Sequence, residues 1–163
     1  MDLAIEIAST NVSRETGGPF GTAIYQRSKK TGKAKLFAVG ANRVTLLNNS
    51  TLHGEMVAIQ FAQKKLSSYS LRKGPLDTEY ILCTSCEPCC MCLGGTLWSG
   101  MHEMWCSATK SDAEAIGFDE GPVYPKSYTH LEDNGCKIKF NMLQEKGAKV
   151  LQRYGETGVI YNS

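Results

Sequence analysis

Long apolar runs are missing from this sequence of 163 residues. No stretch reaches the roughly 18 uninterrupted apolar residues that a membrane-spanning helix needs, which argues against a membrane protein. The first residues, MDLAIEIASTNVSR, also lack the cationic and continuous apolar segments of a secretory signal. We therefore expect a cytoplasmic protein in a reducing compartment, where thiols stay unpaired.

A strong excess of charge of one sign is missing as well. The 18 Lys and Arg residues nearly balance the 16 Asp and Glu residues, so the net charge is only +2. A dedicated nucleic-acid binder usually has a more basic domain with its Lys and Arg residues gathered on one face. The composition therefore argues against a nucleic-acid partner.

Histidine is scarce, since only His53, His102 and His130 occur, whereas cysteine is abundant. Five of the seven cysteines lie in the ten-residue stretch CTSCEPCCMC at 83–92. An odd cysteine count in a reducing compartment argues against a disulfide framework. The cluster therefore points to metal binding or catalysis.

Apolar periodicity and turn residues predict helices that alternate with strands. Helices are expected over 3–12, 53–66, 89–98 and 111–116, with a last helix that runs through Arg153. Strands are expected over 20–26, 35–41, 78–83, 102–107 and 137–140. Such alternation indicates an α/β sandwich with one sheet between helices. The length fits one domain that spans 1–163.

An iron–sulfur cluster is one interpretation of the cysteines. Cys83, Cys86, Cys89 and Cys92 recur at a spacing of three, as in cysteine runs that hold such clusters. In those runs, however, a proline follows the last cysteine, whereas Pro88 lies inside this one. A strand that ends at Cys83 and a helix that begins at Cys89 would also need the loop between them to fold back.

A zinc site explains the pattern better. Cys89 and Cys92 stand three apart near the start of a predicted helix, where the helix dipole favours thiolates. Only one histidine, His53, opens a predicted helix with a carboxylate beside it, Glu55. The combination of HxE with PCxxC is the signature of zinc-dependent nucleobase deaminases. We therefore predict Zn²⁺ with His53, Cys89 and Cys92 as its ligands.

Three protein ligands leave the fourth tetrahedral position of zinc open for water, as catalytic zinc requires. Zinc lowers the pKa of such a water from 15.7 to about 7. Glu55, in an exposed first turn of its helix, would carry protons and would not bind the metal. A purely structural zinc domain would instead close the fourth position, with Cys86 as the candidate, and this alternative stays open.

Six stretches resemble the cytidine deaminase-like superfamily and, more narrowly, its guanine deaminases. They are GGPFGTAIY at 17–25, ANR at 41–43, HGE at 53–55, TSCEPCCMC at 84–92, TLWSG at 96–100 and EAIGFDEGP at 114–122. The resemblance implies a three-layer α/β/α sandwich with a mixed five-stranded sheet, Zn²⁺ as the cofactor, a purine base as the substrate and a homodimer.

The same resemblance implies roles for single residues. Asn42 would hydrogen-bond the edge of the base, and Phe20 and Trp98 would line the pocket. Glu120 would be a second catalytic carboxylate near the departing amine, beside Glu55. Residues 154–163 would either close a pocket across the dimer or simply pack as a final helix and terminus.

The expected reaction is the hydrolytic deamination of guanine to xanthine and ammonia. Gly54 stands where alanine is common in the superfamily, so cytosine, a nucleoside such as cytidine, and adenosine in tRNA remain alternatives. The weak net charge counts against tRNA, because phosphate contacts supply much of such binding.

Overall fold

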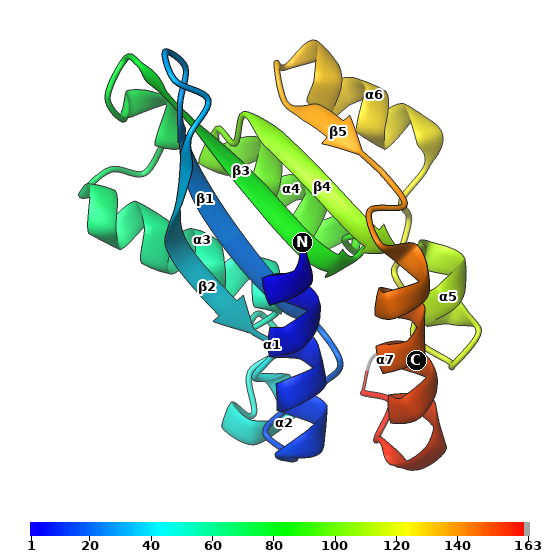
Figure 1. Ribbon diagram of the computed structural model, residues 1–163. Coiled ribbons are helices and arrows are strands. Elements are labelled where there is room, and N and C mark those ends of the chain that lie inside the picture. Colours follow the sequence, from blue (N-terminus) through cyan, green and yellow to red (C-terminus); the bar gives the residue numbers. More distant parts are fainter. Residues whose placement is uncertain (162–163) are drawn as a thin grey trace.

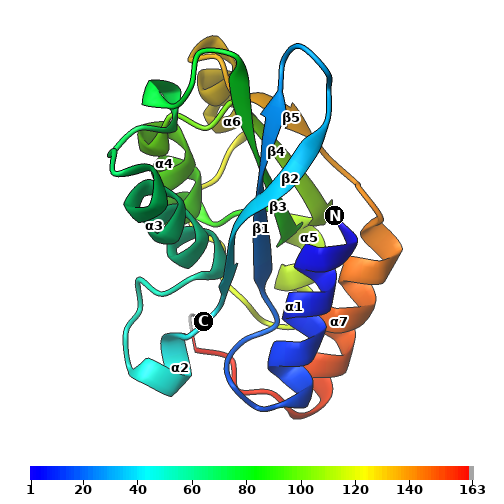
Figure 2. The ribbon, with the colours of Figure 1, turned by 60° about the vertical axis from the view of Figure 1, so that its left-hand side comes forward.

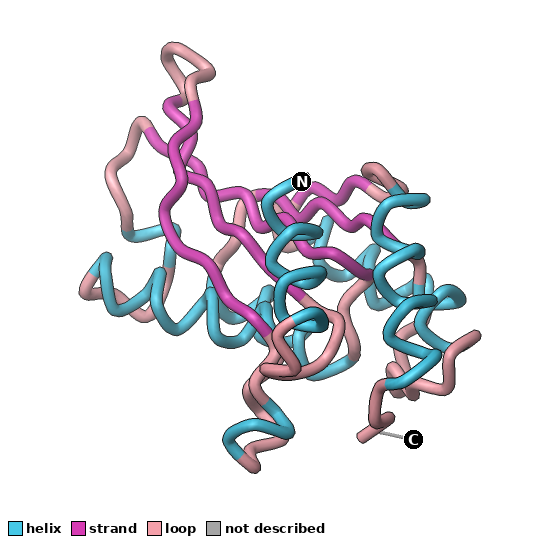
Figure 3. Tube along the Cα trace, turned by 60° about the horizontal axis from the view of Figure 1, so that its bottom comes forward, coloured by secondary structure: helices cyan, strands magenta, loops and turns pink. Residues whose placement is uncertain are grey.

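The computed structural model describes residues 1–161 and shows one mixed sheet with helices on both faces (Figure 1). Its five strands are β1 (Gly21–Ser28), β2 (Ala34–Ala41), β3 (Thr78–Cys86), β4 (Glu103–Ala108) and β5 (Lys137–Lys139), in the order β2-β1-β3-β4-β5. Strand β1 is antiparallel to both of its neighbours, and β3, β4 and β5 are parallel to one another. The β1–β2 hairpin projects beyond the other strands (Figure 3).

Helices form the two outer layers. Helices α3 (Gly54–Leu66) and α4 (Cys90–Ser99) lie side by side on one face, and α1 (Asp2–Ser13) and α7 (Gln144–Thr157) lie on the other (Figure 2). The shorter helices are α2 (Val44–Leu47), the 3₁₀-helix η1 (Leu71–Lys73), α5 (Lys110–Glu114) and α6 (Pro125–Asp133). Within residues 1–161, every helix is too short or too polar to span a membrane.

The three-layer sandwich and its mixed five-stranded sheet confirm the predicted fold class. Two short helices, α2 and α6, were not predicted from the sequence. Helix α2 has only four residues and none of them is buried, while α6 buries only Leu131. Helix α2 is too short to show an apolar period, whereas α6 does have one and starts with a proline typical of a helix N-terminus, so the sequence signal for α6 was overlooked. Strand β3 also runs three residues beyond the predicted end, to Cys86.

The main core fills the space between the sheet and helices α3 and α4. It includes Ile24, Tyr80, Leu82 and Met104, each with no exposed side-chain surface. Helix α3 lies very close to the sheet, because a Cβ atom on Gly40 would stand 2.1 Å from the carbonyl oxygen of Gly54. This contact holds the N-terminus of α3 against the edge strand β2.

Candidate active site

The first part of the site is the N-terminus of α3. His53 is its N-cap residue, with an extended backbone (φ −68°, ψ 155°), and Glu55 lies in the first turn. The prediction of an exposed first turn is wrong, because Glu55 is only 4% exposed. The N-terminus of α3 abuts strand β1, and a Cβ atom on Gly54 would lie 3.2 Å from Thr22 Oγ1.

The second part is the N-terminus of α4, which faces that of α3. Cys89 is the N-cap residue and Cys92 lies in the first helical turn, so the two thiols share one face. Both are buried, Cys92 completely. Strand β3 brings the chain to the end of the sheet where His53 lies, and Pro88 stands between the end of β3 and the start of α4.

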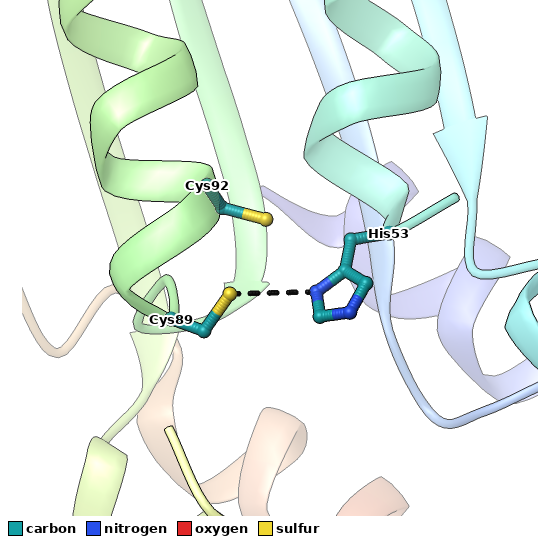
Figure 4. A group of neighbouring side chains, drawn as sticks. All are labelled: His53, Cys89 and Cys92. Atoms are coloured by element: carbon teal, nitrogen blue, oxygen red, sulfur yellow. Dashed lines mark hydrogen bonds between the residues drawn. The ribbon is translucent and has the colours of Figure 1, made fainter. Parts of the chain in front are cut away.

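Three predicted ligands converge between these two helix ends (Figure 4). The Nδ1 atom of His53 and the Sγ atoms of Cys89 and Cys92 all lie within 4.8 Å of one another. The Cys89 Sγ atom stands 3.4 Å from His53 Nδ1. Tetrahedral zinc, with Zn–S near 2.3 Å and Zn–N near 2.0–2.1 Å, would place a sulfur and a nitrogen ligand about 3.5 Å apart. The donor set and its spacing therefore fit Zn²⁺.

The thiol groups are electrostatically coupled. The hydrogen bond from Cys92, together with one from His53, lowers the pKa of Cys89 to about 4. The hydrogen bond that Cys92 donates to Cys89 is the main cause that raises the pKa of Cys92 well above its ordinary value, and burial is the second cause. The lowered pKa favours the thiolate form of Cys89, which is the form in which cysteine binds metals.

The other cysteines stay away from this cluster, and among residues 1–161 only His53, Cys89 and Cys92 form such a group. Cys83 packs beside Ala4 of helix α1. The Cys86 thiol lies 3.4 Å from the Thr109 carbonyl oxygen. The iron–sulfur interpretation and the closed zinc site with Cys86 therefore lack their ligands. Cys90, which lies in the same cysteine-rich stretch, is exposed.

Glu55 faces the metal-ligand cluster from the sheet side. One of its oxygens, Oε1, accepts a hydrogen bond of 2.9 Å from the hydroxyl of Thr84 in β3. Burial, followed by the negative charge of Cys89, raises the pKa of the Glu55 carboxyl. A carboxyl with a raised pKa accepts a proton more readily near neutral pH.

Glu120 approaches the cluster from the segment between α5 and α6. The flanking residues Gly117 (φ 101°) and Gly121 (φ 68°) have positive φ, a conformation that glycine adopts without strain. The Glu120 carbonyl accepts a hydrogen bond from Cys90 N (3.1 Å), which ties the segment to α4. The Glu120 side chain is 5% exposed, and burial, followed by the charges of Cys89 and Glu55, raises its pKa to about 8.

Two adjoining cavities share His53, Cys89 and Glu120. The outer cavity, of about 420 Å³, is also lined by Val44, Ser50, Cys90, Met91, Asp119, Gly121 and Tyr161. The small inner cavity is also lined by Phe20, Glu55 and Glu87. Glu87 was not among the predicted site residues, although it stands in the stretch TSCEPCCMC, and its Oε2 accepts a hydrogen bond of 2.9 Å from Tyr128.

Of two further predicted residues, Phe20 lines a cavity and Asn42 lines neither of the two. Phe20 lines the inner cavity, with its ring edge-on to that of Phe118 at 5.0 Å. Asn42 directly follows β2 and is completely buried, and its Oδ1 accepts hydrogen bonds from Gly18 N (3.3 Å) and Val44 N (3.2 Å). The Nδ2 group of Asn42 has no hydrogen-bond partner among residues 1–161.

Trp98 lies elsewhere. It is 80% exposed on α4 and lines neither cavity. Trp98 follows Cys92 by six residues, which is about 240° beyond one full turn of a helix, so it points away from the face that carries the thiol. Within the described chain, the structure does not bring Trp98 to the predicted pocket.

The C-terminal segment reaches the site of its own chain. Helix α7 ends at Thr157, and the following residues bring the Tyr161 ring to the outer cavity, 5.1 Å from the Phe118 ring. A Cβ atom on Gly18 would stand 2.3 Å from the Tyr161 hydroxyl. Residues 162 and 163, also part of the predicted tail, lie outside the described residues.

Comparison with known proteins places these features in context. Residues 1–108 match the family described as the zinc-binding region of cytidine and deoxycytidylate deaminases. The chain is 37% identical to the guanine deaminase of Bacillus subtilis (strain 168) over 121 residues, which are 74% of this chain and 70% of that protein.

Solved structures extend the similarity to nearly the whole chain. The guanine deaminase from Nitrosomonas europaea is 34% identical with a TM-score of 0.86, covering 95% of this chain and 82% of that one. The structure of NE0047 in complex with 2,6-diaminopurine is 36% identical with a TM-score of 0.87, covering 99% of this chain and 82% of that one.

Proposed function

The chain belongs to the family of zinc-binding cytidine and deoxycytidylate deaminases and is a hydrolytic deaminase, and on that premise we propose that it converts guanine to xanthine and ammonia. The observation that carries the proposal is one inner cavity that joins two metal ligands, His53 and Cys89, to the buried carboxyls Glu55 and Glu120. Similarity to guanine deaminases supports the choice of base.

His53, Cys89 and Cys92 would hold Zn²⁺, because two sulfur donors and one imidazole nitrogen suit this ion and leave one position open. When bound there, zinc supplies a water whose pKa is lowered from 15.7 to about 7.

Glu55 would move the protons of the reaction. Thr84 occupies its Oε1, so Oε2 is the oxygen left to take a proton from the attacking water. The water oxygen forms a bond to the guanine carbon that bears the amine, and Glu55 passes the proton to the adjacent ring nitrogen. Glu55 then carries the remaining O–H proton of the former water to the amine, the carbon–nitrogen bond breaks as the C=O bond forms, and ammonia leaves. General acid–base transfer of this kind contributes about 10²–10⁴-fold in rate.

Glu120 would recognise the base and assist the departing amine. Its buried carboxyl lines both cavities together with His53 and Cys89, so it is within reach of a base bound beside them. There it can accept hydrogen bonds from guanine N–H groups and help to protonate the amine.

Asn42 would select among purines. Two backbone N–H groups hold its Oδ1, so the unpartnered group of the side chain is the NH₂ donor. Guanine offers acceptors at O6 and N7, whereas adenine has an N6 donor in place of O6. A buried free donor is therefore complementary to guanine and less so to adenine.

An ammonia-release assay with guanine, cytosine, adenine, guanosine and cytidine tests this proposal. We expect guanine to be the best substrate by at least about tenfold in kcat/KM, with about one zinc per colourless chain. A higher kcat/KM for cytosine or a nucleoside would overturn the choice of guanine but not the deaminase chemistry.

We also propose that the enzyme is a cytoplasmic homodimer of single-domain chains. Trp98 on α4 and Phe61 on α3 are 80% and 58% exposed on adjoining helices, and such aromatic residues are enriched in interfaces. All seven cysteines are free, which suits a reducing compartment. Light scattering of the purified protein tests the oligomeric state, and a monomer at micromolar concentration would contradict it.

A further inference from the structure

Thr84 lies in the centre of the sheet, directly beneath the catalytic carboxyl. It belongs to β3, opposite Thr22 of β1 on one side and Cys106 of β4 on the other. Its side chain is 1% exposed, and its hydroxyl lies 2.9 Å from Oε1 of Glu55. The contact joins a strand residue to a helix residue that is 29 positions earlier in the sequence.

The direction of this hydrogen bond is determined by chemistry. An ionised carboxylate only accepts, so the Thr84 hydroxyl must donate to Glu55. Among residues 1–161, the hydroxyl has no other hydrogen-bond partner to which its proton could turn. A proton placed on Oε1 would either oppose the Thr84 hydrogen or, by donating to the Thr84 oxygen, leave that hydrogen without an acceptor, whereas a proton on Oε2 keeps the hydrogen bond.

We propose that Thr84 is a positioning residue that holds Glu55 with Oε1 engaged and Oε2 directed to the reacting atoms, so that every shuttled proton travels on Oε2. The water proton moves to Oε2 and leaves from Oε2 to the base, while the Thr84 proton stays on its own oxygen throughout. This inference rests on the proposed role of Glu55 as the proton carrier.

Thr22 offers a matched control. It is also a completely buried threonine and faces Thr84 across the β1–β3 pair. Its hydroxyl has no hydrogen-bond partner among residues 1–161. Replacing Thr22 with valine makes the same chemical change one strand away, at a hydroxyl that packs beside the backbone of Gly54 and makes no hydrogen bond to Glu55.

The test compares Thr84→Val, Thr84→Ser and Thr22→Val with the zinc-loaded parent. Losing a hydrogen bond to a charged group predicts that Thr84→Val lowers kcat for guanine about 10- to 100-fold. Its KM should stay within about threefold, because Thr84 does not line the substrate cavity. Thr84→Ser, which keeps the donor, should restore most of kcat, and Thr22→Val should match the parent.

A double-mutant cycle separates positioning from packing. In the Glu55→Gln background, Thr84→Val should cause no further loss of residual activity, because the group it positions is gone. If Thr84→Val does not fold, Thr84→Ala removes the same hydroxyl without adding a methyl group.

Several outcomes would overturn the inference. These are a Thr84→Val kcat within about twofold of the parent, a Thr84→Ser variant as impaired as Thr84→Val, or a loss of activity in Thr22→Val equal to that in Thr84→Val. The inference about Thr84 alone would be overturned if the parent is active, the Glu55→Gln variant is inactive, and the Thr84→Val variant keeps the activity of the parent. A parent that releases no ammonia from any base would overturn the proposed function as well.

Discussion

The Sγ atom of Cys89 lies 3.4 Å from Nδ1 of His53, although the two residues are 36 positions apart in the sequence. Each is the N-cap residue of its own helix. Two helix N-termini therefore meet at one point, where their dipoles favour negative charge. This arrangement favours the thiolate of Cys89 and is a physical reason for the proposed metal ligands to gather here.

Removal of any ligand should remove the metal. We expect His53→Ala, Cys89→Ala and Cys92→Ala each to bind much less than one zinc per chain, because two remaining ligands hold the ion poorly. Elemental analysis of the purified variants measures this. Cys86→Ala is the control and should keep its zinc, because the Cys86 thiol contacts Thr109 and lies outside the cluster. Zinc loss in Cys86→Ala would mean that the site is closed.

Glu55→Gln should separate binding from catalysis. The amide is nearly isosteric and can still accept from Thr84, but it cannot carry a proton. We expect normal zinc content and an unchanged melting temperature, with kcat reduced about 10²–10⁴-fold. Turnover within about tenfold of the parent would contradict the proton-carrier role of Glu55.

Glu120→Gln should affect the use of guanine more than the fold. Glutamine cannot give a proton to the departing amine, and losing this function in a buried site predicts at least about a tenfold fall in kcat/KM for guanine. Zinc content and melting temperature should stay near those of the parent. Glu132→Gln removes an exposed carboxyl on α6 and serves as the control. Equal kcat/KM values for the two variants would exclude a catalytic role for Glu120.

Gly18→Ala should disturb the C-terminal cover of the outer cavity. A Cβ atom there would stand 2.3 Å from the Tyr161 hydroxyl, so the ring must move. We expect KM for guanine to rise several-fold while zinc binding is retained. Gly94→Ala is the control, because its Cβ would meet no atom within 4 Å and alanine favours a helix. An unchanged KM in Gly18→Ala would show that Tyr161 does not contribute to substrate binding.

Acid stability should depend on Arg27, which pairs with Glu79 (2.5 Å) and with Glu103. The hydrogen bond from Arg27 lowers the pKa of Glu79. Burial alone would raise the pKa of Glu103, but hydrogen bonds from Arg27 and Trp105 outweigh it and lower that pKa too. Because both folded pKa values lie below their unfolded values, the stabilisation is complete above about pH 5 and is lost as the pH falls below about 4.

Arg27→Met should therefore lower the free energy of unfolding by about 1–3 kcal/mol at pH 7, since Glu103 stays buried without its charged partner. Urea titrations at pH 7 and pH 4 should show a smaller difference between parent and variant at the lower pH. Lys146→Met breaks the exposed pair with Asp2 and should leave the unfolding free energy unchanged at both pH values. A pH-independent effect of Arg27→Met would exclude this charge linkage.

Local sequence signals predicted the proposed metal ligands and determined most of the fold. Cys89 and Cys92 follow Pro88 and are three residues apart, so helix geometry alone predicts that their thiols share one face. His53 and Glu55 flank Gly54 at the start of a predicted helix, which places both residues at the same helix end. Alternating apolar patterns likewise predicted all five strands and the helices with a broad buried face.

Only the tertiary structure decided which distant residues meet the site. Thr84 reaches Glu55, and Glu87 and Tyr161 reach the two cavities, because strand register and chain path place them there. The same path leaves Trp98 exposed on the outer part of α4. The spacing of residues within one helix or turn predicts which side chains share a face of that element. The contacts of Thr84, Glu87 and Tyr161 depend instead on how separate elements pack together, and no local pattern encodes that packing.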